Sequence, residues 1–297
     1  MRRFGNGFFI LFLLFLAGFW LLRSGDVHAA TEYAVRLCVF SLLPALFPFF
    51  ILTDLLISLG FPAVIGRVLR RPMEQLYRIG GSGSSALVLG FLGGYPTGAR
   101  TVASLYMSGE LSRDEAERLP AFSNNGSPAF LIGFVGGEVF HDTGIGLCLW
   151  LIHVASALLT GLLFRGRGAL RRRALPPQKQ EPLPGLLLHA VSTALSSFLS
   201  VCSVVLLFSV LSFPLQGCGF LSCLLELTGG LSRLPASPLG FAAAGFFCGF
   251  GGLAVQLQSL AFLLPAGLSP RNLLLGKLCH GLLAGLLSLL ITPLLFP

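Results

Sequence analysis

Long apolar stretches without a charged residue are the feature that most constrains how this chain can fold. A helix needs about 20 apolar residues to cross the hydrocarbon of a bilayer. Only 11% of the 297 residues are charged and 54% are hydrophobic, which is more apolar surface than one water-soluble core can bury. Apart from single histidines, the uncharged stretches cover 8–22, 79–99, 119–137, 143–164, 185–225, 234–270 and 278–297. The sequence therefore predicts an all-α polytopic membrane protein with the lipid bilayer as its solvent.

The basic residues gather in two clusters between apolar segments. One cluster spans 67–78 and the other spans 165–179, and the net charge is +8. Such clusters mark cytoplasmic loops by the positive-inside rule, and they lack the interleaved aromatic residues of a nucleic-acid surface. We therefore expect a basic cytoplasmic linker over 165–184, a cytoplasmic N-terminus and no nucleic-acid partner.

Residues 1–32 resemble a signal peptide, with a basic start, an apolar core and small residues around Ala30. The rest of the chain is itself expected to span the membrane, so an uncleaved N-terminal transmembrane helix, a signal-anchor, is predicted. Cleavage after Ala30 is the alternative.

The two halves of the chain, repeat 1 over 33–164 and repeat 2 over 185–297, share a glycine-rich motif. GFLGGYPTGA at 90–99 aligns with GFFCGFGGLA at 245–254. Because glycine and proline inside a segment end helices, both motifs predict a broken helix. A chance match between two glycine-rich segments is the alternative.

Each motif is expected to form a re-entrant hairpin, the first over 79–107 and the second over 236–265. The outer loops of the second half carry few cations, namely Arg233, Arg271 and Lys277. With this charge distribution the two hairpins enter from opposite sides of the membrane. Inverted-topology repeats with broken helices are a transporter architecture.

A substrate-binding segment is predicted at Gly94, Thr97, Gly98 and Arg100. The glycines let a ligand approach the backbone closely, and a helix that begins near Thr97 points free N–H groups at an anion. An arginine within a membrane segment costs about 2.5–3.5 kcal/mol, which a carboxylate held by two hydrogen bonds would offset. The alternative is that Arg100 reaches the inner membrane surface or binds a structural carbonyl group.

A second set of candidates, Ser123, Asn124, Asn125 and Ser127, lies inside an uncharged span. Unpaired amides and hydroxyls are costly in hydrocarbon, so a buried broken helix is expected here, with Pro128 in the first turn of its second part. A polar turn outside the membrane is the alternative.

The remaining candidates are polar residues within apolar parts of the second half, namely Glu226, Thr228, Gln256 and Gln258. Glu226 is suited to holding a coupling cation or a proton. The alternative places it at the outer surface beside Arg233. Asp54 is a weaker candidate that can equally face the inner headgroups.

Covalent catalysis is not expected. The sequence has no HExxH, GxSxG or P-loop motif, and His153, His189 and His280 stand singly on apolar segments, where a histidine is usually a packing residue. The seven cysteines form no CxxC pair and are expected to be small buried residues without disulfides. No catalytic residue, metal ligand or cofactor is predicted, and the coupling ion is left open.

Four segments keep a distinctive order and spacing. They are GFLGGYPTGARTVASLY at 90–106, GELSRDEAERLPAFSNNGSPAFLIGFVG at 109–136, LELTGG at 225–230 and GFGGLAVQLQ at 249–258. Together they resemble the YlbJ family (also called SpoVV) of sporulation integral membrane proteins, and the resemblance runs through roughly 40–297. One departure is Gly126-Ser127-Pro128, where the family commonly has Ser-Gly-Pro after the asparagine pair.

The resemblance implies a nucleoside-recognition Gate-like domain in repeat 1 and a role in endospore formation. It places the protein in the mother-cell-derived outer forespore membrane, as a transporter that helps dipicolinate pass towards the spore. Arg100 and the Asn124 and Asn125 amides suit this flat aromatic dianion. A nucleoside or nucleobase transporter is the alternative, because a neutral nucleoside needs no arginine. An alternative of another class is a non-transporting membrane scaffold.

Overall fold

The structure is a computed structural model that describes residues 2–166, 182–212 and 219–296. These residues form helices and connecting turns without a β-strand, which confirms the all-α polytopic class. Within this described part of the chain, four helices are long and apolar enough to cross a membrane, and one bent pair would make a fifth span. Most of the predicted basic linker, and Cys218, lie outside the described residues.

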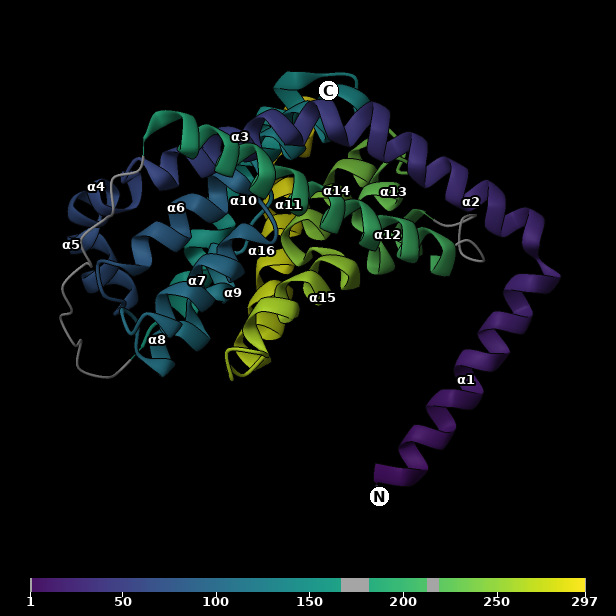
Figure 1. Cartoon of the computed structure of the whole chain (residues 1–297). Helices are drawn as coiled ribbons and strands as arrows, with labels where there is room; N and C mark the ends of the chain where they lie inside the picture. Colours follow the sequence, from purple (N-terminus) through teal and green to yellow (C-terminus); the bar gives the residue numbers. More distant parts are fainter. Residues whose placement is uncertain (1, 167–181, 213–218, 297) are drawn as a thin grey trace.

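The N-terminal region consists of two helices that meet at a bend. Helix α1 (Arg2–Leu22) is followed by α2 (Ser24–Arg36), and the two axes differ by 91°. Figure 1 shows α1 projecting away from the other helices. The chain therefore turns at Arg23, and the apolar helix expected within 1–32 ends at Leu22; its role as a signal-anchor stays a prediction.

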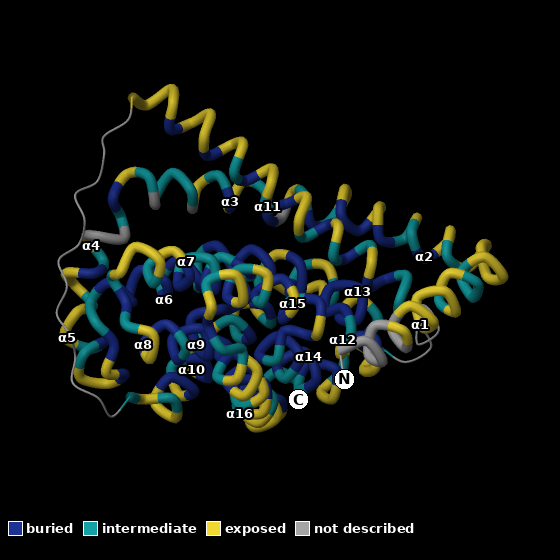
Figure 2. Tube along the Cα trace, turned by 60° about the horizontal axis from the view of Figure 1, so that its bottom comes forward, coloured by how far each residue is buried: buried dark blue, intermediate teal, exposed yellow. Residues whose placement is uncertain are grey.

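A long bent helix continues from α2 into the body of the molecule. It passes through the wider turns of η1 (Leu37–Leu42) into α3 (Leu43–Ser58), which contains Pro48. Helix α11 (Leu183–Ser212) packs along α2 and α3, as Figure 2 shows. Short helices follow α3 at one end of the molecule: α4 (Phe61–Val68), α5 (Arg70–Pro72) and η2 (Met73–Tyr77).

The first glycine-rich motif forms a helical hairpin, as predicted. Helix α6 (Gly83–Gly93) and α7 (Thr97–Met107) pack against each other across the break at 94–96. Gly94 has a φ of 73°, in the left-handed region that favours glycine. The hairpin closes tightly because a Cβ atom on Gly90 would lie 3.3 Å from the Cα of Gly98.

The predicted broken helix around the asparagine pair is also confirmed. After α8 (Arg113–Arg118), the short α9 (Pro120–Ser123) ends at Asn124, and η3 (Ala129–Val139) starts directly after Pro128. Helix α10 (Thr143–Leu163) follows as a candidate span.

The second half differs from the prediction. After α12 (Gly219–Leu225) and α13 (Leu227–Leu231), helices α14 (Pro238–Phe250) and α15 (Gly252–Leu263) together form one candidate span of 26 residues. Gly251 and Gly252 have φ values of 87° and 66°, so the helix is broken there. Since the chain does not fold back at this break, the second hairpin expected over 236–265 is wrong.

The last helix, α16, is the packing partner of α14. Helix α16 (Arg271–Leu295) runs back along α14, and this is the most extensive helix pair in the described structure. Glycines permit the close approach, because a Cβ atom on Gly249 would lie 2.8 Å from the Cα of Gly281. α14 therefore packs on α16 and not on α15.

The outer surface of the bundle is apolar. Large side chains such as Leu188, Leu290 and Leu294 are exposed on the long helices, while Figure 2 shows buried residues concentrated in the interior. Leucine on the outside and polar residues inside is the distribution expected of helices surrounded by lipid.

Candidate functional site

The hairpin, the asparagine pair and the second half meet in the interior of the bundle. Asn124 accepts a hydrogen bond from the backbone N–H of Ala99 at 3.3 Å through Oδ1, and its Nδ2 donates to Ser259 Oγ at 2.6 Å. A Cβ atom on Gly98 would collide with the carbonyl group of Ser123. Asn124 therefore ties α7 and α15 to the break after α9.

The second asparagine has a local role. Asn125 Nδ2 donates to the carbonyl oxygen of Phe122 at 2.7 Å, while its Oδ1 is buried without a partner. Ser127 caps the next helix, since its Oγ accepts from the N–H of Phe130 at 3.2 Å. The side-chain amides of Asn124 and Asn125, which were predicted to bind a ligand, therefore mainly form hydrogen bonds that stabilise the broken helix.

The predicted site residues separate into two cavities. The larger, here called the Arg100 cavity, has a volume of about 320 Å³. Its lining consists of Pro96, Thr97, Arg100, Thr193, Ser196, Ser197, Ser200 and Phe262. Ser196, Ser197 and Ser200 of α11 follow Thr193 by three, four and seven residues. One face of that helix therefore presents hydroxyl groups to the cavity.

Arg100 is half-exposed in this cavity, and Asp54 is its nearest charged neighbour. The Arg100 Nη2 and Asp54 Oδ1 atoms are 3.9 Å apart, and the side chains are 41% and 14% exposed. This distance is too long for a hydrogen bond, so the guanidinium keeps donors free. The sequence left Asp54 either as a weak binding candidate or as a residue that faces the inner headgroups. The structure gives it another role, that of a loose counter-ion for Arg100.

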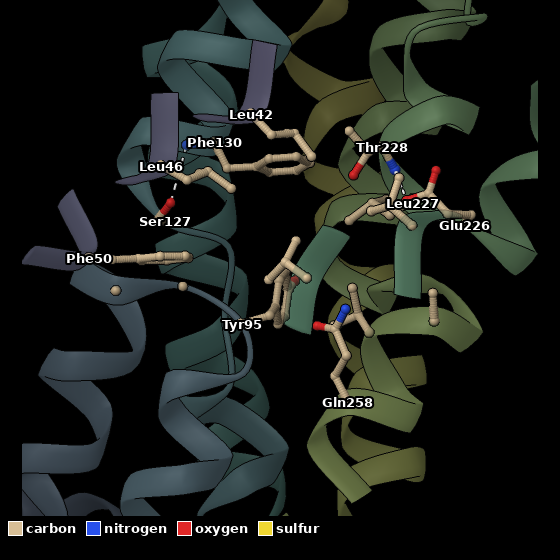
Figure 3. A pocket seen from close by; sticks show the side chains of 16 residues that line it. Leu42, Leu46, Phe50, Tyr95, Ser127, Phe130, Glu226, Leu227, Thr228 and Gln258 are labelled. Atoms are coloured by element: carbon tan, nitrogen blue, oxygen red, sulfur yellow. Dashed lines mark hydrogen bonds between the residues drawn. The ribbon is translucent and has the colours of Figure 1, made fainter. Parts of the chain in front are cut away.

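The smaller cavity, here called the Glu226 cavity, has a volume of about 50 Å³. Its lining includes Gly94 and the polar side chains of Tyr95, Ser127, Glu226, Thr228 and Gln258, and the rest is mainly apolar. Figure 3 shows Tyr95 and Gln258 beside one another, with Glu226 and Thr228 on neighbouring backbone. Among the residues that the structure describes, no arginine or lysine belongs to this lining.

Glu226 is buried, since only 3% of the residue is exposed, and Arg233 lies nearby, because both side chains come within 4 Å of the Cβ position of Gly229. Its carboxylate accepts from the N–H of Thr228 at 2.8 Å and from the N–H of Gly229, which caps α13. The carboxylate is therefore partly committed to local structure. Gln256 donates to the carbonyl oxygen of Phe250 at 3.4 Å and lines neither cavity.

A third polar cluster was missed by the sequence predictions. Lys277, placed above in an outer loop, is fully buried in α16. Its Nζ lies 3.0 Å from His280 Nδ1, and His280 Nε2 in turn lies 3.0 Å from the backbone oxygen of His153 on α10. The loop assignment is wrong because the helix begins at Arg271, six residues earlier.

The periodicity of α16 is the signal that could have located this cluster. Lys277, His280, Ala284 and Ser288 are all buried and follow helical spacing along one face. Small and polar residues on one face of an apolar helix mark the packed side in a membrane bundle. His153 and His280, which stand singly in the sequence, lie together in the structure with ring centroids 4.4 Å apart, and both are buried.

Fold and cavities together define an integral membrane protein of helices, with two cavities between the halves of the chain. Among known proteins, the chain is similar to the sporulation integral membrane protein YlbJ of Bacillus subtilis (strain 168), with 29% identity over 185 residues. The match spans 62% of this chain and 45% of the relative's length. It confirms the resemblance carried by the four motifs and supports membership of the YlbJ family. The apolar helices make this chain an integral membrane protein, and the relative that it resembles is a sporulation protein of that kind.

No family model matches the sequence, and no solved structure matches the fold.

Proposed function

We propose that this chain is a sporulation-associated transporter that moves a small aromatic carboxylate across the outer forespore membrane. Dipicolinate is the substrate that the family resemblance suggests. The proposal treats the chain as a carrier without catalytic residues or cofactor, with its N-terminus and basic linker in the cytoplasm. The observation that carries it is the Arg100 cavity.

The chemistry of this cavity suits a flat dicarboxylate. The planar guanidinium of Arg100 can hold a carboxylate through two parallel hydrogen bonds. Thr97 on α7 and Thr193 on α11 supply hydroxyl donors, and the ring of Phe262 on α15 supplies an apolar face for an aromatic ring. The volume of about 320 Å³ lies in the range of ligand pockets.

The position of the cavity suits transport. Pro96, Thr97 and Arg100 come from the first half, and the other lining residues come from α11 and α15 in the second half. A site between two halves can open to either side when one half moves against the other. A substrate carboxylate would replace Asp54 as the partner of Arg100, so that binding also releases a contact between α3 and α7.

Thermal unfolding of the purified full-length protein in detergent tests this proposal. Dipicolinate at about 100 times its dissociation constant should add about 2.7 kcal/mol of stability. The increase should be absent with pyridine, which lacks carboxylates, and in Arg100→Gln. It should persist in Arg36→Gln, which alters an exposed arginine paired with Glu32. Equal stabilisation of wild type and Arg100→Gln by dipicolinate would contradict the proposed site.

A nucleoside transporter is the second candidate, favoured by the Glu226 cavity. Its polar lining is Tyr95, Ser127, Glu226, Thr228 and Gln258, without a basic residue, as a neutral polar ligand requires. At about 50 Å³ the cavity would have to widen. Stabilisation by uridine but not by dipicolinate, lost in Gln258→Leu, would favour this function.

A non-transporting scaffold is the candidate from another class. It would need no ligand in either cavity, so Arg100→Gln should then leave spore formation unchanged while the protein remains at normal abundance.

A further inference from the structure

Lys277 carries an ionisable group in the centre of the packed helices. None of its surface is exposed, and its Nζ donates to the backbone carbonyl oxygen of Asn124. The Nζ atom also lies 3.0 Å from His280 Nδ1 and 5.4 Å from the centroid of the Tyr95 ring. Within the described ranges, no ion pair joins Lys277 to a carboxylate.

The hydrogen bonds around Lys277 fix the protons on both histidines. His280 Nε2 lies 3.0 Å from the carbonyl oxygen of His153, so Nε2 carries a hydrogen and Nδ1 presents a lone pair to Lys277. His153 Nε2 accepts from the N–H of Gly126 at 3.0 Å, and its Nδ1 is buried without a partner. Both rings are therefore neutral in this arrangement, and Lys277 can donate to His280.

A buried ammonium without a counter-ion is unfavourable in a low-dielectric interior. A leucine or methionine at this position would fill similar space without that cost. Ionisable residues that persist inside membrane segments are typical of ion and proton pathways. The geometry thus calls for a role beyond the hydrogen bond to Asn124.

We propose that Lys277 and His280 form a proton-binding site that couples proton movement to substrate movement. This inference rests on the proposed transport function and names H⁺ as the coupling ion. In the exchange step, a proton leaves Lys277 Nζ and joins His280 Nδ1, giving a neutral amine and an imidazolium ion. The imidazolium donates from Nε2 to His153 and from Nδ1 to the amine, so both protonation states keep their hydrogen bonds.

Tyr95 connects this site to the Glu226 cavity. One face of its ring lies against Lys277, and the same residue lines the cavity together with Glu226 and Gln258. A volume of about 50 Å³ accommodates a few water molecules. The small cavity therefore brings water as far as the Tyr95 ring, and a movement of that ring would let protons reach Lys277 while the substrate occupies the larger Arg100 cavity.

Few other titratable groups face the proposed site. Helix α10 contributes His153, the α6–α7 break contributes Tyr95, and α14 contributes Cys248, whose carbonyl oxygen accepts from the Tyr95 hydroxyl. Charged residues of α8 pack near the N-terminal end of α16, where Glu117 accepts from the N–H of Ser269. These residues of α8 are Arg113, Asp114, Glu115, Glu117 and Arg118.

The composition of the chain offers a direct test, because its only lysines are Lys179 and Lys277. In Lys179→Arg, an ¹⁵N-lysine label reports on Lys277 alone. We expect its NMR signal to change between ammonium and amine positions as pH is varied. The midpoint should move in His280→Gln and stay in place in His28→Gln, which alters an exposed histidine. An unchanged midpoint in His280→Gln would overturn the proton site, whether or not the protein transports anything.

Coupling is tested in proteoliposomes that contain a pH-sensitive dye. A dipicolinate gradient should change the lumenal pH with wild type and with Arg271→Met, an exposed residue of the same helix. Lys277→Met should still exchange labelled dipicolinate but should reduce the pH change at least tenfold. A pH change equal to that of wild type would overturn the coupling role. Absence of dipicolinate exchange in wild type itself would instead count against the proposed function, and the NMR titration would still decide the proton site.

Discussion

The interior polar residues differ in how much of their hydrogen-bonding capacity is occupied. Asn124 and Ser127 are bound to protein groups, whereas Arg100 has only the loose contact with Asp54. A group with free donors in a cavity can bind a ligand without first breaking strong internal bonds. The residue with the weakest internal contacts is thus the best ligand-binding candidate.

Asp54 is expected to compete with the substrate for Arg100. Asp54→Asn removes the negative charge 3.9 Å from the guanidinium, so dipicolinate affinity should rise by up to about tenfold, or about 1.4 kcal/mol. Isothermal titration calorimetry on the purified protein measures this change. Glu32→Gln, which alters an exposed partner of Arg36, should leave affinity unchanged. Weaker binding to Asp54→Asn would show that Asp54 positions Arg100 rather than competing.

Asn124 and Ser259 should be energetically coupled. Their 2.6 Å hydrogen bond joins two buried side chains, so loss of either partner should cost about 1–3 kcal/mol. A double-mutant cycle of Asn124→Ala and Ser259→Ala, followed by chemical unfolding in detergent, should give a coupling energy of about 0.5–3 kcal/mol. Additive effects of the two substitutions would argue against the bond.

At the scale of elements, the α6–α7 hairpin depends on glycine at positions where a helix packs directly against the backbone of another segment. A Cβ atom on Gly98 would collide with the carbonyl group of Ser123, and a fixed carbonyl group cannot move aside as a flexible side chain can. The two glycine-rich motifs thus share broken helices but not their packing, because the glycines of α14 face α16 instead.

Gly98→Ala should therefore destabilise the protein by about 1–3 kcal/mol through overpacking. Gly133→Ala is the matched control, since nothing lies within 4 Å of its added Cβ, and it should be neutral or slightly stabilising. The measurement is the melting temperature of each variant in detergent, compared with that of wild type. Equal melting temperatures would contradict the close contact between α7 and the α9 break.

The positions of helix breaks could be predicted from sequence, but the path of the chain after a break could not. Gly94 and Pro96 end one helix and Pro128 starts another, because these residues limit backbone geometry locally. Whether the chain then folds back depends on distant partners, as α14 shows by packing on α16. For the same reason the sequence indicated Arg100 and Glu226 as candidates but not their separation into two cavities. Lys277 was missed because it was counted as a loop cation instead of being placed on a helical face.

At the scale of the whole molecule, the bundle presents leucine to lipid and gathers its polar groups between the two halves. Both cavities draw residues from each half, so relative movement of the halves would change both at once. Under the proposed function, this arrangement would link a substrate in the Arg100 cavity to the buried groups behind the Glu226 cavity. The inverted relation between the halves stays a prediction.

Uptake of labelled dipicolinate by proteoliposomes containing the full-length protein tests the proposed transport most directly. We expect uptake well above that of protein-free liposomes, at least tenfold less in Arg100→Gln, and unchanged in Arg36→Gln. Unlabelled dipicolinate should compete and uridine should not. Wild-type protein that is folded, yet takes up dipicolinate no faster than protein-free liposomes, would contradict the proposed function.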